Sequence, residues 1–292
     1  MKYGQDETLT VLVVTRNHQD FIAEALQSVH MQRDVEIARL VVSDDCSTDR
    51  TVEVAHDVLR RLEMKAEVLE STEQMGITPH YEKLFSGVDT DLVAVLEGDD
   101  YWFDSLKLSR QLSLLRDYPY TSACALGYMQ YHHATRALEG RNFGSGELSI
   151  MSTEDLVKGG DGLGFSNMVY RTAALRRIPP EFYSLQSYDW IMNVLVSRQA
   201  PLVRLEVPGF VHRVTSTGAW GGLDLAAQLE DFVETVESYL PHSDDYLAGL
   251  LEAKLAEARE ELDLARAPES VPAAPPTLAR RAKSAVKRRL GR

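Results

Sequence analysis

The sequence predicts an α/β protein built on an open sheet flanked by helices. Apolar, mostly β-branched runs at residues 9–14, 40–42 and 92–96 have the composition of buried strands. The first two are each followed by a polar segment and then by apolar residues at helical spacing. In open α/β sheets, ligands bind beyond the carboxyl ends of the strands, so the polar segments mark the expected site.

The first strand leads into a loop of Thr15, Arg16 and Asn17 and then into a predicted amphipathic helix. The loop contains neither G-x-G-x-x-G nor G-x-x-x-x-G-K-[ST], which excludes the dinucleotide fingerprint and the P-loop. Arg16 supplies one cation for a phosphate, although an exposed Arg is also common as a plain surface side chain. The apolar face of the helix comprises Phe21, Ile22, Ala25, Leu26 and Val29.

The second strand runs into an acidic loop, residues 43–49, which contains Asp44 and Asp45. An ionised carboxylate only accepts hydrogen bonds, so this loop suits ribose hydroxyls or a base N–H. A helix is predicted after the loop, with Ser47 or Thr48 placed to cap its start. Its apolar positions are Val52, Ala55, Val58, Leu59 and Leu62.

The third strand ends in a second acidic segment, residues 97–100, of sequence Glu-Gly-Asp-Asp. Like charges crowded at a strand end are destabilising unless a cation lies between them, and Mg²⁺ and Mn²⁺ prefer carboxylate oxygens. The alternative is a tight turn before a helix that begins near Ser105 and is capped by Asp104. Because the loop at residues 43–49 is also acidic and is expected to face the same crevice, the metal site is the favoured interpretation.

Three ordered segments, residues 11–17, 42–49 and 96–102, resemble the successive signatures of family 2 glycosyltransferases. Their order and spacing agree with that family over roughly residues 8–220. The resemblance implies a GT-A fold, in which a Rossmann-like nucleotide-binding half is merged with an acceptor-binding half. It also implies an inverting enzyme that transfers a sugar from a nucleotide diphosphate donor.

On the donor side, the resemblance assigns Asp44 or Asp45 to the nucleoside. It places Thr15 in the strand-end loop around the base, with Arg16 and Asn17 beside it.

In the family's D-x-D motif, Glu97 takes the first position and Asp99 the last, with Gly98 between them. Asp99 is therefore the implied main ligand of a divalent Mg²⁺ or Mn²⁺ ion, supported by Asp100. A Glu at the first position places its carboxylate about one methylene further out, so Glu97 is expected to contact the ribose or a metal-bound water.

On the acceptor side, residues 187–191 resemble the family's acidic motif, which makes Asp189 the implied general base. Inversion requires a carboxylate that takes the proton of the acceptor hydroxyl while the nucleoside diphosphate leaves from the opposite face. The alternative is an acidic helix N-terminus favoured by the macrodipole. Trp102 and Trp190 are the expected acceptor contacts, and residues 159–171 either shape the acceptor pocket or only connect two elements.

Residues 210–220 resemble the family's Tyr-Arg-x-His segment. Arg213 matches the Arg and is an implied phosphate contact, because its planar fork binds two oxygens at once. Thr215 stands at the His position, and His212 lies three residues before it. In the loop before the third strand, His80 occupies a position where the family usually has Asn.

The chain is long enough for one large domain with an appendage. Its two cysteines argue against a disulfide framework, and its net charge of −13 argues against a nucleic-acid substrate. The N-terminus lacks a signal-peptide core and no apolar run reaches membrane-spanning length, so a cytoplasmic enzyme is expected. The predicted divisions are a transferase domain at residues 1–222, a helical appendage at 223–267, a Pro/Ala-rich linker at 268–276 and a basic tail at 277–292.

Two helices are predicted within the appendage, on either side of Pro241. They either pack on the catalytic domain or pair with a second subunit as a homodimer, since the second helix approaches heptad spacing. The tail at residues 277–292 contacts anionic lipid at the inner face of the membrane if it forms a basic amphipathic helix. The alternative is a disordered, solvated tail.

The predicted function is inverting, metal-dependent transfer of a sugar from a UDP-, dTDP- or GDP-linked donor to a hydroxyl of a glycan or lipid-linked acceptor, in polysaccharide or cell-surface glycan biosynthesis. A sugar-1-phosphate nucleotidyltransferase would carry a Gly-rich, Arg-containing loop after the first strand, and residues 15–19 contain no glycine. A non-catalytic nucleotide-sugar-binding protein would have lost the base, whereas Asp189 and Asp99 are both present.

Overall fold

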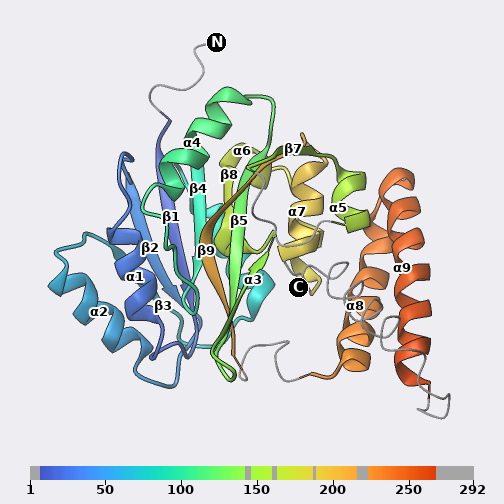
Figure 1. Cartoon of the computed structure of the whole chain (residues 1–292), viewed down its shortest axis with the longest axis horizontal. Helices are drawn as coiled ribbons and strands as arrows, with labels where there is room; N and C mark the ends of the chain where they lie inside the picture. The colour runs from blue at the N-terminus through green and yellow to red at the C-terminus, as the bar shows by residue number, and fades with distance from the viewer. Residues whose placement is uncertain (1–6, 142–145, 160–162, 187–188, 216–222, 268–292) are drawn as a thin grey trace.

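The computed structural model describes residues 7–141, 146–159, 163–186, 189–215 and 223–267 of the 292 in the chain. Within these ranges, one nine-stranded sheet runs in the order β3-β2-β1-β4-β8-β5-β9-β7, and β6 pairs with β5 (Figure 1). The strands are β1 (Leu9–Thr15), β2 (Arg39–Asp44), β3 (Glu67–Glu70), β4 (Leu92–Glu97), β5 (Ala123–His132), β6 (Ala137–Arg141), β7 (Leu148–Met151), β8 (Met168–Arg171) and β9 (Leu202–Val214).

Helices pack on both faces of the sheet, and each face has its own hydrophobic core. Successive residues of β1 alternate between the two cores, with Val11 and Val13 in one and Leu12 in the other, as the two-residue repeat of a strand requires. The helices are α1 (Ile22–His30), α2 (Thr51–Arg61), α3 (Ile77–Ser86), α4 (Lys107–Asp117), α5 (Thr153–Gly159), α6 (Thr172–Leu175), α7 (Asp189–Ser197), α8 (Leu225–Tyr239) and α9 (Asp245–Arg266), with 3₁₀ turns η1 (Phe165–Asn167), η2 (Pro180–Ser184) and η3 (Leu240–His242).

The first core joins the sheet to α1, α2 and α4, and the second joins it to α3, α5, α7, α8 and α9. The predicted strands at residues 9–14, 40–42 and 92–96 are confirmed as parts of β1, β2 and β4. These strands and β3 are mutually parallel, and the direction changes at β4, which pairs antiparallel with β8. The block of parallel strands β3, β2, β1 and β4 therefore ends at the strand that carries the second acidic segment.

The helix after the acidic loop starts later than predicted, and its proposed capping by Ser47 or Thr48 is wrong. The helix begins at Thr51, whose amide donates to Asp49 Oδ1 at 2.9 Å. Ser47 instead accepts a hydrogen bond from the amide of Asn17 at 2.8 Å. The reason is that Ser47 lies too far from the first helical turn and is used to join two loops.

Side chains bond backbone amides near the starts of two further helices. Asp104 Oδ1 accepts from the amide of Leu106 at 2.9 Å, immediately before α4. At α5, the amide of Ser152 donates to Asp155 at 2.8 Å, and the Asp155 amide donates back to the Ser152 hydroxyl at 3.2 Å. This reciprocal pair satisfies donors that a helix N-terminus leaves unpaired.

The two C-terminal helices pack on the sheet domain, which is one of the two predicted alternatives. Apolar residues of α8 and α9 belong to the same core as α5 and α7, including Phe232, Val236, Leu251 and Leu255. Pairing with a second subunit stays a prediction. The linker at residues 268–276 and the tail at 277–292 lie outside the described residues. Within the described residues, no helix is both long and apolar enough to span a membrane.

Candidate active site

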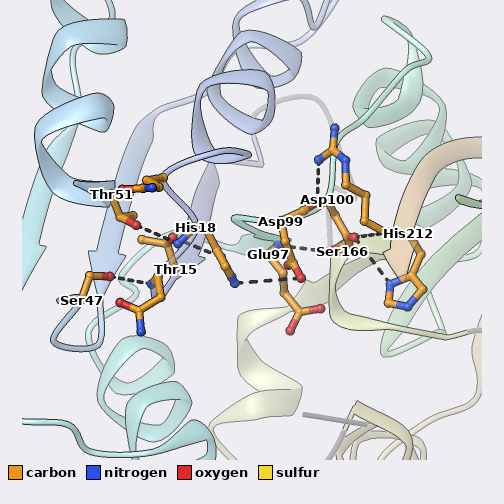
Figure 2. A network of polar contacts seen from close by, with 12 residues as sticks. Thr15, His18, Ser47, Thr51, Glu97, Asp99, Asp100, Ser166 and His212 are labelled. Atoms are coloured by element: carbon orange, nitrogen blue, oxygen red, sulfur yellow. Dashed lines mark hydrogen bonds and ion pairs between the residues drawn. The ribbon is translucent and has the colours of Figure 1, made fainter. Parts of the chain in front are cut away.

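The ends of β1, β2 and β4 meet at one edge of the sheet. In the parallel register, Thr15 lies opposite Asp44 and Val14 lies opposite Glu97. The loops that follow these strands therefore leave the sheet at the same level. Figure 2 shows the resulting row of polar side chains, which runs from Ser47 through Thr15 and the acidic segment to His212. The expectation that both acidic loops face one site agrees with this geometry.

Gly98 is a glycine because two side chains occupy the space of a Cβ atom. An ideal Cβ at this position would lie 2.5 Å from Thr15 Oγ1 and 2.8 Å from His18 Nδ1. Those two atoms lie 3.2 Å apart, and His18 Nε2 is 3.9 Å from Asp99 Oδ2. The ring of His18 thus passes beside Gly98 and reaches the acidic segment (Figure 2).

The loop between β1 and α1 is fastened to the acidic loop after β2. Asn17 has a left-handed backbone, with φ of 54°, and its side-chain oxygen accepts from the amide of Thr48 at 2.8 Å. An Asn tolerates this conformation better than most residues. Arg16 is exposed, and within the described part of the chain it forms no hydrogen bond or ion pair. It is thus a cation at the rim of the site that a phosphate can reach.

The two aspartates predicted to hold the nucleoside are buried and bonded to backbone amides. Asp44 accepts from the amide of Ser47 at 2.7 Å. Asp45 accepts from the amides of Met75 and Gly76 at 2.8 and 3.0 Å, one on each oxygen. The Asp45 carboxylate therefore holds the loop before α3 against the end of β2. Each carboxylate still has lone pairs that these bonds do not use.

Cys46 and His80 flank these aspartates. Cys46 has φ of 60°, in the left-handed region that glycine adopts most easily, and a half-buried side chain. His80 is buried, and its Nε2 atom lies 2.7 Å from the Ser43 hydroxyl. Burial lowers the pKa of His80, so the neutral ring is the favoured form. Its role is to join α3 to β2.

Four carboxylates influence one another at the end of β4. Burial raises the pKa of Glu97 well above its usual value, and Asp100, Asp99 and Asp189 push it in the same direction. Burial and Asp100 raise the pKa of Asp99, while His18 and His212 oppose the rise. In this arrangement, the charged forms of Glu97 and Asp99 are disfavoured unless a cation joins them.

The residues fit a divalent ion that takes most of its ligands from a substrate. Asp99 is 23% exposed and can be reached from the crevice, whereas Asp100 is buried and accepts from the amide of Arg213 at 2.9 Å. Among the described residues, no group of three His, Cys, Asp or Glu side chains is arranged to hold an ion. Mg²⁺ is commonly held by one or two carboxylates together with phosphate oxygens, and Asp99 would provide such a carboxylate.

Arg213 braces the acidic segment from the side of β9. Its guanidinium donates to the backbone oxygen of Asp99 at 2.5 Å and pairs with Glu24 of α1. It lies 4.6 Å from the ring centre of Tyr101 and 5.2 Å from that of Phe21. Since both ends of the fork contact protein groups, a phosphate would have to displace Glu24 to bind here. The predicted phosphate contact stays a prediction.

His212 precedes Arg213, and its side chain contacts Asp100 of the acidic segment (Figure 2). Its Nδ1 atom lies 3.5 Å from Asp100 Oδ1. Burial alone would lower the pKa of His212, but the carboxylates of Asp100 and Asp99 outweigh burial and raise the pKa above its usual value. The nearby carboxylates therefore favour the protonated ring more strongly than burial disfavours it.

Asp189 begins α7 on the far side of the acidic segment. One of its oxygens accepts from the adjacent Trp190 amide at 2.7 Å, and a Cβ placed on Gly164 would lie 3.4 Å from the other oxygen. The position fits an acidic helix N-terminus, and the charge of Asp189 is one of the causes that raise the pKa of Glu97. The two alternatives considered for Asp189 are therefore compatible.

The two predicted acceptor tryptophans differ in exposure. Trp190 is half-buried, donates to the Leu156 carbonyl at 2.9 Å and lies 5.2 Å from the ring of Phe232. Trp102 is 0% exposed, and its indole N–H donates to the Ser166 carbonyl at 2.8 Å. The acceptor role predicted for Trp102 is wrong, because the side chain is enclosed by the core.

Comparison with known protein families identifies the chain. The model described as "Glycosyl transferase family 2" matches residues 10–178, which is more than half of the sequence. The chain belongs to glycosyl transferase family 2. The matched segment includes both acidic loops of this glycosyltransferase, whereas Asp189 and Arg213 lie beyond it.

Curated relatives match most of the chain, and solved structures share its fold. The uncharacterised proteins Rv1520 of Mycobacterium tuberculosis and Mb1547 of Mycobacterium bovis are each 24% identical over 217 residues, which is 73% of this chain. The chain spans 60% of the length of these curated relatives. TarS of S. aureus in complex with UDP-GlcNAc has 18% identity and a TM-score of 0.66, with 86% of this chain and 71% of that chain covered.

A mannosyltransferase from Pyrobaculum calidifontis, in complex with GDP-Man and Mn²⁺, has 16% identity and a TM-score of 0.61, covering 96% of this chain and 79% of that chain. GalNAc-T7 with UDP, GalNAc and Mn²⁺ has 12% identity and the same TM-score, covering 98% and 55%. At these identities the likeness concerns the fold. The expectations of family 2 and of the GT-A fold are confirmed.

Sequence reasoning missed three residues of this glycosyltransferase that contact the predicted site. His18 reaches Asp99, Glu24 pairs with Arg213, and Ser166 accepts from the Glu97 amide. A signal existed for His18 alone, because it follows Asn17 in the loop after β1. Glu24 and Ser166 lie at ordinary positions of a helix and a Gly-rich segment, and only the tertiary structure brings them to the site.

Proposed function

We propose that this protein is an inverting glycosyltransferase that moves a sugar from a nucleotide diphosphate donor to a hydroxyl of a glycan or lipid-linked acceptor. Mg²⁺ or Mn²⁺ is the proposed cofactor, and polysaccharide or cell-surface glycan biosynthesis is the proposed setting. The observation that carries the proposal is the convergence of Glu97, Asp99, Asp100 and Asp189 at the end of β4. There the pKa of both Glu97 and Asp99 is raised in the absence of a cation.

The donor is proposed to bind along the ends of β1, β2 and β4. Asp44 and Asp45 offer their remaining lone pairs to the nucleoside, and Arg16 offers its guanidinium to a phosphate. Solved structures of the same fold support a nucleotide-linked donor, since their complexes contain UDP-GlcNAc, GDP-Man or UDP. Two of them contain Mn²⁺, which supports a divalent ion at Asp99.

In the proposed reaction, Asp189 removes the proton of the acceptor hydroxyl. The hydroxyl oxygen forms a bond to the anomeric carbon as the bond from that carbon to the diphosphate breaks on the opposite face, which inverts the configuration. An ion at Asp99 would supply positive charge to the leaving diphosphate. Glu97 contacts the ribose or the ion's hydration shell, and the half-buried Trp190 contacts the acceptor beside Asp189.

A sugar-1-phosphate nucleotidyltransferase is less well supported. The loop after β1 carries no glycine, and Asn17 closes it against Ser47 and Thr48. That closure is suited to a base and ribose contact and leaves no Gly-rich cradle for a triphosphate.

A cytoplasmic location and a contact of residues 277–292 with the inner face of a membrane belong to the proposal as well.

A thermal-shift screen tests the proposed function. UDP-, dTDP- and GDP-linked sugars are added with Mn²⁺ or with EDTA, since a ligand that binds only the native state raises its stability. We expect one nucleotide class to raise the melting temperature in Mn²⁺ and to have a much smaller effect in EDTA. The absence of any shift with all three classes in Mn²⁺ would reject a nucleotide-sugar donor.

A further inference from the structure

The acidic segment lies where two paired strands separate. β4 and β8 run antiparallel, with Leu92 opposite Arg171 and Ala94 opposite Val169. Continued by three more residues, this register would place Glu97 opposite Ser166. The chain instead turns into η1 (Phe165–Asn167), so the backbone ladder stops before the end of β4. The separation of β4 from β8 opens the sheet beside the carboxylate cluster.

The hydroxyl of Ser166 replaces the missing ladder bond. Alternate amides of β4 donate to β1, as the Leu92 and Gly98 amides do, so the Glu97 amide faces the side of β8. It donates to Ser166 Oγ at 3.0 Å (Figure 2). Ser166 is 1% exposed, so water cannot take over this role. A side chain therefore completes the sheet at the residue that begins the acidic segment.

Ser166 also holds the other end of that segment. Its carbonyl oxygen accepts from the indole N–H of Trp102 at 2.8 Å, and Trp102 is fully buried. The residues between Glu97 and Trp102 are thus fixed at both ends by one serine. This pair of contacts also explains why a tryptophan stands in the core two residues after the acidic segment.

On its opposite side, the turn is anchored to the half of the protein that carries Asp189. The Asn193 side chain of α7 donates to the Leu163 carbonyl at 2.5 Å. Gly164 lies beside the Asp189 carboxylate. Gln111 of α4 donates to the Asn167 carbonyl at 2.7 Å, which fixes the end of the turn. The turn therefore joins the acidic segment to the helix of the proposed base.

We infer that Ser166 is a positioning residue that holds Glu97 and Asp99 in place for a metal-bound diphosphate. This inference rests on the proposed function. The carboxylates of Glu97, Asp99 and Asp100 repel one another, and the hydrogen bond at the Glu97 amide resists that repulsion. Without it, the buried amide is unpaired and the segment relaxes away from the geometry that an ion and a diphosphate require.

The test compares Ser166→Ala with Ser197→Ala by calorimetric titration of UDP, dTDP and GDP, each in Mn²⁺ and in EDTA. Ser197 is a matched control, because it is also buried and its hydroxyl makes two hydrogen bonds, to Thr153 and Val194, away from the crevice. We expect Ser166→Ala to weaken binding in Mn²⁺ by about ten-fold, in line with the loss of a buried hydrogen-bond partner. Binding in EDTA should be unchanged, and Ser197→Ala should match the wild type in both conditions.

Trp102→Phe is the second variant, because it removes the indole N–H that holds the Ser166 carbonyl and keeps an aromatic core residue. It should also weaken binding in Mn²⁺ and not in EDTA. The inference is overturned if Ser166→Ala binds in Mn²⁺ as tightly as Ser197→Ala, or, where Ser166→Ala does not fold, if Trp102→Phe binds as tightly as the wild type. A wild-type protein that binds none of the three nucleotides in Mn²⁺ would instead reject the proposed function and this inference with it.

Discussion

The two sides of the active site are held together in different ways. The loops after β1 and β2 are fixed by bonds of short and medium range, such as Ser47 to Asp44 three residues away and Thr48 to Asn17 31 residues away. The acidic segment, which lies between these donor loops and Asp189, is fixed by more distant residues. Arg213 reaches Asp99 across 114 positions, and Ser166 reaches Glu97 across 69. The donor loops therefore depend on nearby parts of the sequence, whereas the acidic segment toward the acceptor side depends on the completed fold.

The largest expected effect separates the chemistry of the two sides. Asp189→Asn should reduce transfer by about 10²- to 10⁴-fold, because an amide cannot accept the proton of the acceptor hydroxyl. Binding of the nucleoside diphosphate in Mn²⁺, measured by calorimetry, should stay close to wild type. Asp99→Asn should reduce both transfer and Mn²⁺-dependent binding. Near-normal turnover of Asp189→Asn would mean that another carboxylate is the general base. It would contradict the assignment of Asp189 to proton transfer on the acceptor side.

A second prediction concerns Lys107, at the start of α4 beside Trp102. Its ammonium is fully buried, donates to Gln111 at 2.6 Å and lies 4.3 Å from the centre of the Trp102 ring. Burial lowers the pKa of Lys107 to about 7 from 10.5. The unfolded chain therefore holds this proton more tightly, and the free energy of unfolding should rise with pH between about 7 and 10.5.

Lys107→Met removes this charge and keeps a long apolar side chain. We expect a melting temperature several degrees higher than wild type at pH 7, with the difference narrowing toward pH 9 to 10, at roughly 2–4 °C per kcal/mol for a protein of this size. Lys158→Met is the control, because Lys158 is exposed on α5. Parallel melting curves for Lys107→Met and wild type across this pH range would contradict the buried-charge explanation.

The third prediction tests the packing between β1 and β4. Gly98→Ala places a methyl group against Thr15 and His18 and should lower the free energy of unfolding by about 1–3 kcal/mol, the usual range for overpacking. Gly87→Ala is the control, since its nearest Cβ neighbour would be at 3.5 Å, an ordinary contact. Equal urea midpoints for the two variants would show that the strand ends adjust to the methyl group.

The smallest expected effect lies within the donor side itself. Asp45→Asn keeps one acceptor oxygen but turns an amide NH₂ toward Met75 N or Gly76 N, so one of two backbone bonds is lost. We expect a loss of about 1 kcal/mol in the free energy of unfolding. Weaker nucleoside diphosphate binding, in EDTA as well as in Mn²⁺, should accompany it. Asp57→Asn, at an exposed position of α2, should change neither.

The same contrast explains how far sequence reasoning reached. The strands at β1, β2 and β4 and the helices after β1 and β2 follow from hydrophobic spacing that is local to each element. Gly98 and the acidic residues could be found because they lie in short motifs at strand ends. The sequence also predicted the helical pair after residue 222, whose apolar faces pack against α5 and α7.

The remainder of the site depends on contacts that no local pattern contains. The core position of Trp102 follows from the carbonyl of Ser166, which is 64 residues away. Arg213 pairs with Glu24 of α1 because the fold brings β9 close to that helix. The motif at residues 210–220 identified Arg213 but could not identify Glu24 as its partner. The helix start at Thr51 was missed because Ser47 joins two loops instead of capping.

The loop around Cys46 has a practical consequence. Cys124 is fully enclosed and burial raises the pKa of its thiol to about 12, whereas Cys46 is half-buried in the loop that also carries Asp44 and Asp45. A thiol-reactive dye should therefore attach to one position of the native protein. This natural labelling site would let a fluorescence titration report nucleotide occupancy directly, with no engineered cysteine and no knowledge of the acceptor.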